Sequence, residues 1–171
     1  FEDTLLLGCL LITLLKHSDR VKIACLAQLV NVIAPIMTNP DGDAWRQTIF
    51  YPFMQVSNYG RGTVLRPLVE SEFYATKDFE KVPYLESIAV VNEEKNELVI
   101  FAVNRAKETM DFHIELGDLV VENVIEFSQI CGSEIKEVNT EKEERIKPVS
   151  SKNYSLDNGI NCCLQSLSWN M

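Results

Sequence analysis

The spacing of apolar residues along the chain changes character near residue 62. Before that point apolar residues come in long blocks with few charges, such as residues 5–15 and 21–28. After it the segments are shorter, and many alternate apolar with polar residues between charged turns. Long blocks are typical of buried helices and of strands covered on both faces, whereas alternation is typical of half-buried strands. Two regions of different architecture are therefore expected.

The first region opens with a predicted helix and a predicted strand. Acidic residues stabilise a helix N-terminus, so Glu2 and Asp3 favour a helix start, and residues 5–15 are apolar nearly all round. After a turn at Ser18 and Asp19, residues 21–28 are apolar on both faces, which predicts a buried parallel strand.

A loop over residues 31–42 and a second helix over residues 48–59 complete this region. Pro52 requires the helix either to start near it or to kink there, and Gly60 is expected to end it. A single unit of helix, strand, loop and helix cannot close a sheet. Residues 1–62 are therefore predicted to be the end of a larger α/β domain.

A period of two dominates the rest of the chain. Met110, Phe112 and Ile114 alternate with polar residues, and residues 97–104 place Val99, Phe101 and Val103 on one face. The NEEKN stretch at residues 92–96 predicts a hairpin turn between strands at residues 84–91 and 98–104. Further strands are expected at residues 65–75, 120–130, 135–138, 162–164 and 166–169, with a solvated loop at residues 139–152. About seven antiparallel strands predict a β-sandwich.

Composition narrows the classes of protein. The chain has 171 residues, 46% of them hydrophobic, and a net charge of -9, which argues against binding nucleic acid or an anionic membrane through a positive field. The apolar run at residues 5–15 is shorter than the roughly 20 residues of a membrane span, and the FEDT before it is acidic, unlike a signal peptide. Because Phe1 is not an initiator Met, the chain is expected to start inside a longer protein.

The cysteines and histidines predict no metal site and no cofactor. Five cysteines are present, an odd number, and Cys9 and Cys25 lie in apolar runs. This pattern favours reduced, packed thiols in a reducing compartment, consistent with a cytoplasmic protein. With two histidines and no CxxC pair, a structural zinc site is not expected.

Three stretches carry a family resemblance: VKIACLAQLVNVIAPI at residues 21–36, AWRQTIFYPF at residues 44–53 and YGRG at residues 59–62. They resemble the α-L-arabinofuranosidases of glycoside hydrolase family 51, as do FAVNR at residues 101–105 and LSWN at residues 167–170. The match runs through residues 1–70 with almost no gap and becomes sparse in the β-rich region.

The resemblance implies a (β/α)₈ barrel followed by a C-terminal β-sandwich. Residues 1–62 would be the last βα unit of the catalytic barrel, with residues 21–28 as its eighth strand, and residues 63–171 would form most of an antiparallel sandwich. Such enzymes remove terminal arabinofuranosyl groups from arabinans, arabinoxylans and arabino-oligosaccharides with retention of configuration. The implied partners are these sugars, the remainder of the same polypeptide and further copies of the protein in a homo-oligomer.

The same resemblance implies that no catalytic residue lies in this chain. Retaining glycosidases use two carboxyl groups about 5–5.5 Å apart, and in this family they end the fourth and seventh barrel strands, which would precede Phe1. Glu2, Glu70 and Glu72 lie outside the catalytic motifs and are expected to be solvated or capping residues. The isolated chain is therefore predicted to be inactive.

Gln28 is the one residue to which the resemblance assigns substrate binding. Functional groups of such barrels lie at the C-terminal ends of the strands, and a carboxamide offers both donors and an acceptor to sugar hydroxyls. If Gln28 faces the barrel axis, so do Ala24 and Leu26. The alternative is a buried glutamine paired to backbone.

Other residues have expected roles that are structural or open. Asn31 is expected to order the loop after the strand, and Trp45, beside Arg46 and Gln47, could stack on a sugar or pack the loop. Cys25 is expected to pack against a helix, and Cys162 and Cys163 to fill the core on opposite faces of a strand. For Asn104 and Arg105 an interdomain or turn role is expected.

A competing hypothesis for the whole chain is that it is a non-catalytic carbohydrate-binding or oligomerisation module.

Overall fold

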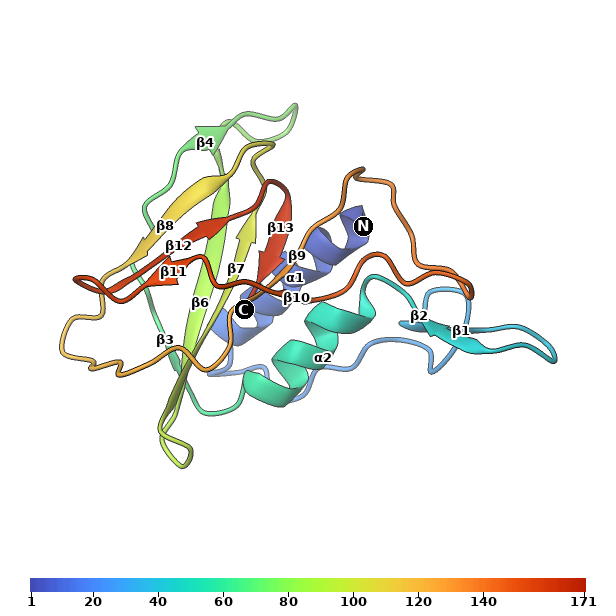
Figure 1. The fold of residues 1–171 in the computed structure, drawn as a ribbon, viewed down its shortest axis with the longest axis horizontal. Helices are drawn as coiled ribbons and strands as arrows, with labels where there is room; N and C mark the ends of the chain where they lie inside the picture. Colours follow the sequence, from blue (N-terminus) through green and yellow to red (C-terminus); the bar gives the residue numbers. More distant parts are fainter.

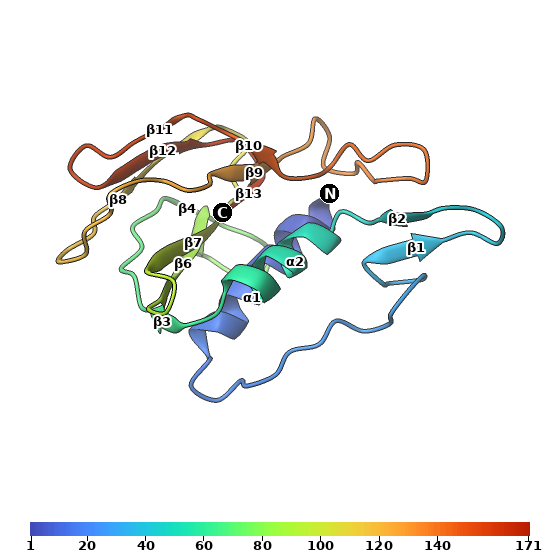
Figure 2. The same ribbon diagram turned by 60° about the horizontal axis from the view of Figure 1, so that its bottom comes forward.

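Antiparallel strands dominate the fold, which a computed structural model describes for all residues 1–171. Two helices lie against one sheet, and a second sheet covers part of its other face (Figure 1; Figure 2). In chain order the elements are α1 (Glu2–Lys16), β1 (Ile36–Thr38), β2 (Ala44–Arg46), α2 (Phe50–Tyr59), β3 (Thr63–Leu65), β4 (Phe73–Tyr74), β5 (Val82–Pro83), β6 (Leu85–Asn92), β7 (Glu97–Asn104), β8 (Met110–Ile114), β9 (Ser128–Ile130), β10 (Val149–Ser150), β11 (Tyr154–Ser155), β12 (Ile160–Leu164) and β13 (Ser168–Asn170).

The predicted antiparallel sandwich is confirmed. Its larger sheet has six strands in the order β10-β9-β13-β7-β6-β3, and its smaller sheet has three in the order β11-β12-β8. Two further pairs, β1-β2 and β4-β5, stand apart from these sheets. Every strand pairing is antiparallel.

The β6–β7 hairpin forms the centre of the larger sheet. Its register pairs Leu85 with Asn104 at one end and Asn92 with Glu97 at the other, so residues 93–96 make the turn that NEEKN predicted. Alternation sends Phe101 and Val103 to the helix face of the sheet and Ala102 to the face that meets the smaller sheet. Both faces of β7 are therefore covered at its C-terminal half.

The main core lies between the helices and the larger sheet. It joins residues from α1, α2 and four strands with Phe1 and the loop residue Ile146, as one cluster: Phe1, Leu5, Ile12, Tyr51, Ile88, Val90, Phe101, Val103, Ile130, Ile146 and Trp169. Trp169 is fully buried and stacks on Phe101, with ring centroids 5.5 Å apart. Gly8 allows this packing, because a Cβ there would lie 2.5 Å from Cε3 of Trp169. A smaller cluster of Leu85, Ala102, Phe127 and Leu164 fills the space between the sheets.

The predicted helices form, and the proline conflict is resolved. The second helix begins at Phe50, so Pro52 lies in its first turn, where the absent N–H has no intrahelical partner to lose. Gly60 is the residue that follows the helix, as expected. Neither helix is long and apolar enough to span a membrane.

The strand predicted at residues 21–28 does not form in this chain. Most of it is exposed, including Ile23 at 84% and the predicted inward-facing Ala24, and Cys25 is exposed rather than packed on a helix. A strand exists only where a neighbour accepts and donates its backbone hydrogen bonds, and no strand of this chain pairs with these residues. In Figure 2, the segment between α1 and β1, which contains these residues, runs outside the two helices.

Several predictions in the β-rich region also need correction. Residues 135–138 form no strand, and the strands expected at residues 65–75 and 120–130 shrink to short pieces near their ends. The predicted solvated loop at residues 139–152 contains a buried anchor, since Asn139 and Ile146 are 6% and 1% exposed. The sequence did not predict this anchor, because a single apolar residue among many charged ones shows no periodicity.

Candidate functional site

Gln28 lies on the surface of the structure, in the segment that follows α1. Its side chain is exposed, and its backbone has a φ of 58°, a left-handed value that is uncommon for a residue other than glycine. The structure therefore does not pair Gln28 with backbone in a core, as the alternative interpretation required. Its assignment as a sugar-binding residue stays a prediction.

Asn31 orders the chain after Gln28, as expected. Its Oδ1 accepts a hydrogen bond from the backbone N–H of Thr38 at 2.7 Å, and its Nδ2 donates to Oγ1 of Thr38 at 3.0 Å. The backbone N–H of Asn31 donates to the carbonyl of Ile36 at 2.8 Å. With a φ of 64°, Asn31 uses the left-handed conformation that asparagine tolerates better than most residues. It therefore ties the Gln28 segment to strand β1.

The residues after Asn31 form a hairpin that sequence reasoning interpreted as a loop. In the pairing of β1 with β2, Ile36 lies opposite Arg46 and Thr38 lies opposite Ala44. Trp45 lies opposite Met37 and is half-buried. Gln47 closes the base of this hairpin, because its Nε2 donates to the carbonyl of Ala34 at 3.0 Å. Stacking on a sugar and packing of the hairpin both stay predictions for Trp45.

A cluster of polar side chains surrounds Tyr51 where β2 meets α2. Arg46 lies with its guanidinium 5.3 Å from the centre of the Phe50 ring, and its Nη1 is 3.5 Å from Oε1 of Glu144. Burial, and then the nearby Glu144, raise the pKa of the Tyr51 hydroxyl, so this phenol stays protonated over the working range of most enzymes. This group joins the hairpin to the loop that contains Glu144.

The three carboxylates considered in the sequence do not converge. Glu2 forms an ion pair with Lys136, and the hydrogen bond from that lysine lowers the pKa of the Glu2 carboxyl. Glu70 and Glu72 are exposed on the loop that leads to β4. These positions fit the solvated roles expected for them.

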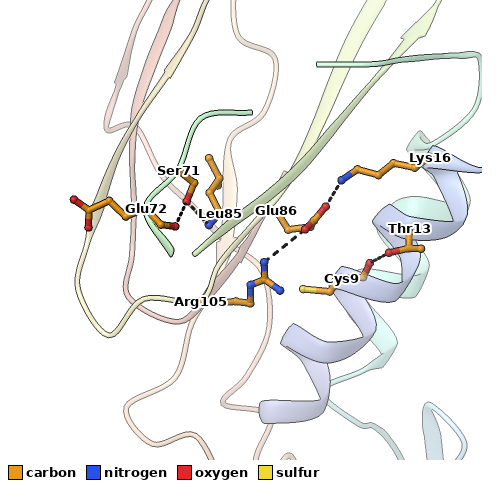
Figure 3. Close-up of polar contacts among 8 residues, drawn as sticks. All are labelled: Cys9, Thr13, Lys16, Ser71, Glu72, Leu85, Glu86 and Arg105. Carbon is orange, nitrogen blue, oxygen red and sulfur yellow. Dashed lines mark hydrogen bonds and ion pairs between the residues drawn. The ribbon is translucent and has the colours of Figure 1, made fainter. Parts of the chain in front are cut away.

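An ion network links α1 to the larger sheet (Figure 3). Glu86, on β6, contacts Lys16 of α1 through one carboxylate oxygen, and its other oxygen lies 3.5 Å from Nη2 of Arg105. Cys9 points toward Arg105 from α1 in Figure 3, and burial raises the pKa of its thiol, so the thiol is neutral and acts as a packing group. Sequence reasoning missed Glu86, because nothing in the sequence places it opposite α1.

Asn104 is the last residue of β7 and adjoins Arg105 of this network. Its side chain orders the turn that follows the strand. Its Nδ2 donates to the carbonyls of Glu108 and Gln165, and its Oδ1 accepts from the backbone N–H of Ala106 at 2.9 Å. The expected turn role of Asn104 is therefore confirmed, and Arg105 joins the network through Glu86. No group of three or more His, Cys, Asp or Glu side chains is arranged to hold a metal ion.

Comparison with known proteins identifies the family. The family described as "Alpha-L-arabinofuranosidase C-terminal domain" matches residues 1–168. An intracellular exo-alpha-(1->5)-L-arabinofuranosidase 1 of Bacillus subtilis is 48% identical over 172 residues, which cover 100% of this chain and 34% of that protein. A relative named intracellular exo-alpha-(1->5)-L-arabinofuranosidase, from Acetivibrio thermocellus, is 47% identical and is covered over 35% of its length.

Solved structures agree with this match. A family 51 alpha-L-arabinofuranosidase from Bifidobacterium longum superposes with a TM-score of 0.91 at 34% identity, over 99% of this chain and 34% of that chain. The fold is also similar to that of a thermostable enzyme from Thermotoga petrophila, with a TM-score of 0.80 at 24% identity. The chain thus spans about a third of the length of the relatives it matches. It belongs to the alpha-L-arabinofuranosidase C-terminal domain family, the C-terminal region of glycoside hydrolase family 51 enzymes.

Proposed function

We propose that this chain is the C-terminal part of a retaining α-L-arabinofuranosidase acting on terminal arabinofuranosyl groups of arabinan, arabinoxylan or arabino-oligosaccharides. The observation that carries the proposal is the match of the whole chain to about a third of proteins named exo-alpha-(1->5)-L-arabinofuranosidases. No carboxylate of this chain has a catalytic role in the proposal. The two catalytic carboxyl groups belong to the region of the relatives that this chain does not span.

Residues 1–62 are proposed as the end of the catalytic barrel and residues 63–171 as the sandwich. Exposed apolar side chains support this division, because Leu6 and Leu10 on α1 are 59% and 52% exposed, and Ile23 and Leu29 are each 84% exposed. Apolar surface of this extent normally marks an interface. The remainder of the polypeptide is the proposed cover, and residues 21–28 become a strand when neighbouring barrel strands supply hydrogen-bond partners.

The two proposed regions still share one core. Leu5 and Ile12 of α1 and Tyr51 of α2 pack in the same cluster as strand residues of the sandwich. The boundary near residue 62 is therefore a boundary between architectures, and the helices depend on the larger sheet for burial.

Within this proposal, Gln28 binds the sugar. At the C-terminal end of the eighth barrel strand its carboxamide would face the mouth of the barrel, and its donors and acceptor suit neighbouring hydroxyls. The test is Gln28→Ala in the full-length enzyme, with an aryl arabinofuranoside as substrate. A fall in kcat/KM of about tenfold or more, typical of losing a hydrogen bond to a substrate, supports the assignment. An unchanged kcat/KM would overturn it.

The isolated chain tests the catalytic part of the proposal. It should not hydrolyse an aryl arabinofuranoside, whereas the full-length enzyme should do so under the same conditions. Turnover by purified residues 1–171 would show that the catalytic groups lie within them. The relatives named intracellular and the free cysteines of this chain support a cytoplasmic enzyme. A homo-oligomer is part of the proposal because the family resemblance implies it.

A second candidate function, sugar binding by the sandwich itself, is favoured by one groove. The groove encloses about 1150 Å³ beside β8, and Tyr74 and Tyr84 line it with ring centroids 4.9 Å apart. Aromatic faces beside carboxylates such as Glu72 and Asp111 are suited to sugar rings and hydroxyls. Calorimetry with arabinoxylan tests this function. The isolated chain should bind arabinoxylan without hydrolysing it, and Tyr74→Ala should abolish the binding.

A further inference from the structure

The loop at residues 139–146 of the sandwich contacts the β1–β2 hairpin, which follows Gln28 in the chain. This loop lies against the β1–β2 hairpin at the end of the molecule where both protrude (Figure 1; Figure 2). Glu141 accepts a hydrogen bond from Nδ2 of Asn39 at 2.8 Å on one oxygen and from the backbone N–H of Asp43 at 3.0 Å on the other. One carboxylate therefore connects both ends of the hairpin turn.

The turn is shaped to receive this carboxylate. Gly42 lies between the two residues that Glu141 contacts, and a Cβ at Gly42 would be 2.6 Å from Oε1 of Glu141. Any side chain at that position would push the carboxylate out of the turn. Arg46, at the end of β2, adds a second connection to the same loop through Glu144 at 3.5 Å.

The loop that carries Glu141 is anchored in the core. Asn139 is buried, its Nδ2 donates to the carbonyl of Ile146 at 2.7 Å, and its Oδ1 accepts from the N–H of Ile146 at 2.8 Å. The Ile146 side chain belongs to the main core. Thr140 and Glu143 exchange backbone hydrogen bonds between these anchors. Glu141 thus projects from a loop closed at its base, which limits how far the carboxylate can move.

The β1–β2 hairpin is in turn hydrogen-bonded to the residues that follow Gln28. Thr38, at the end of β1, holds both polar atoms of the Asn31 side chain, and Gln47, beyond β2, holds the carbonyl of Ala34. Asn31 is three positions beyond Gln28 in the sequence. Each link from Glu141 to Asn31 is therefore a hydrogen bond or a strand pairing.

We propose that Glu141 is a positioning residue for the sugar-binding end of the barrel: it holds the β1–β2 hairpin, and through Thr38 and Asn31 it sets where Gln28 meets the substrate. This inference rests on the proposed function, because it requires Gln28 to contact the sugar. It assigns the sandwich a role in substrate binding that is separate from sugar binding in its own groove.

The test uses the full-length enzyme and compares four variants. Glu141→Ala removes both contacts, Gly42→Ala displaces the carboxylate without deleting it, and Glu141→Gln keeps one acceptor oxygen for the N–H of Asp43. Glu143→Ala is the matched control, because Glu143 is in the same loop and its side chain pairs only with Arg145. All four are assayed for KM and kcat on an aryl arabinofuranoside.

The expected result is a rise in KM with kcat nearly unchanged, because the sugar is held less well in the ground state and the transition state alike. The rise should be about fivefold to tenfold in Glu141→Ala, as for a modest misplacement of a binding group. Gly42→Ala should show a similar rise, Glu141→Gln a smaller one, and Glu143→Ala less than about twofold, within the range of a neutral surface change. Equal KM values for Glu141→Ala and Glu143→Ala would overturn the proposal.

Two further measurements separate this inference from the assignment of Gln28. In a Gln28→Ala background, Glu141→Ala should change KM by less than about twofold, because residues that act through one contact are not additive. An undiminished effect there would show that Glu141 does not act through Gln28. If Gln28→Ala alone leaves kcat/KM unchanged, the proposed function of Gln28 fails, and this inference fails with it.

Hydrogen exchange tests the structural part independently of activity. In Glu141→Ala, amide exchange should accelerate over residues 31–46, including the amides of Asn31 and Thr38, and should not change at β6 and β7. Faster exchange that stops at the hairpin turn, without reaching Asn31, would overturn the transmission to the Gln28 segment.

Discussion

Gly8 lies against the sheet without room for a Cβ, and Gly8→Ala tests this packing of α1. Gly8 is buried within α1 and faces Trp169 and Val103. An added Cβ would lie 2.5 Å from Cε3 and 3.0 Å from Cζ3 of Trp169, and 3.1 Å from Cγ2 of Val103. These distances are shorter than the roughly 3.5–4.0 Å of a relaxed contact between carbons, so the helix or the ring must move.

Two opposing effects set the outcome. Replacing a glycine in a helix interior by alanine favours the helix by about 1 kcal/mol, whereas overpacking a tight core costs about 1–3 kcal/mol. The cost should be in the middle or upper part of that range, because Trp169 cannot retreat. Its ring is fully buried, it stacks on Phe101, and its Nε1 donates to Oε1 of Gln55 at 2.7 Å. The net expectation is a loss of about 1 kcal/mol in the free energy of unfolding.

Urea unfolding of the purified chain, followed by far-ultraviolet circular dichroism in dilute solution, measures this loss. Trp169→Phe is the informative partner, because phenylalanine lacks the outer ring atoms that approach Gly8. In that background Gly8→Ala should become neutral or stabilising, giving a coupling energy of about 1–2 kcal/mol, typical of residues in contact. Thr13→Ala, on the exposed side of α1, is the control for a change to alanine without a core contact, although it also removes the hydrogen bond from Oγ1 to the carbonyl of Cys9. Stabilisation by Gly8→Ala in the wild-type background would refute the argument.

Three other predictions follow from burial and charge. Gln55→Leu should lower the free energy of unfolding by about 1–3 kcal/mol, because it removes the partners of Trp169 and Ser128 in the core; equal urea midpoints for the variant and the wild type would contradict this. Burial raises the pKa of Cys162 from 9.0 to about 11, so the folded state holds this proton more tightly and stability should be constant below pH 9 and fall as pH rises toward 11. Cys162→Ala should flatten this fall, and iodoacetamide should modify the exposed Cys25 well before Cys162. The isolated chain should self-associate in light scattering, and the double variant Ile23→Asp, Leu29→Asp should reduce its mass toward 19.5 kDa; a wild-type chain that is already monomeric would count against the exposed apolar surface as an interface.

Local pattern was enough to predict the elements whose partners are near in sequence. The β6–β7 hairpin was predicted within a residue of its bounds, because its two strands and its NEEKN turn lie within one 20-residue stretch. The first helix was likewise predicted from its acidic start and its apolar run, and strand β8 from its two-residue period. Gly60 predicted the end of α2, and a start near Pro52 was one of two alternatives for its beginning, because each residue acts through its own backbone geometry.

Position in the candidate site depended on contacts that no local pattern contains. Gln28 was selected from the sequence through a family resemblance, and the structure does not test its contact with sugar. The role of Glu141 could not be predicted, because its partners Asn39 and Asp43 are about 100 positions away in the sequence. The same limit hid Glu86, whose partner Lys16 is 70 positions away.

By itself, therefore, the sequence determined which segments are helical, which alternate, and to which family the chain is similar. The tertiary structure decided whether an apolar run becomes a strand, and which charged residues of the 139–152 loop are held in place. Residues 21–28 have the composition of a strand, but a strand requires backbone partners from elsewhere. Asn139 and Ile146 lie in a charged stretch, but they anchor it because distant core residues surround Ile146. Periodicity specifies the face of an element, whereas hydrogen-bond partners and burial come only from segments that folding brings together.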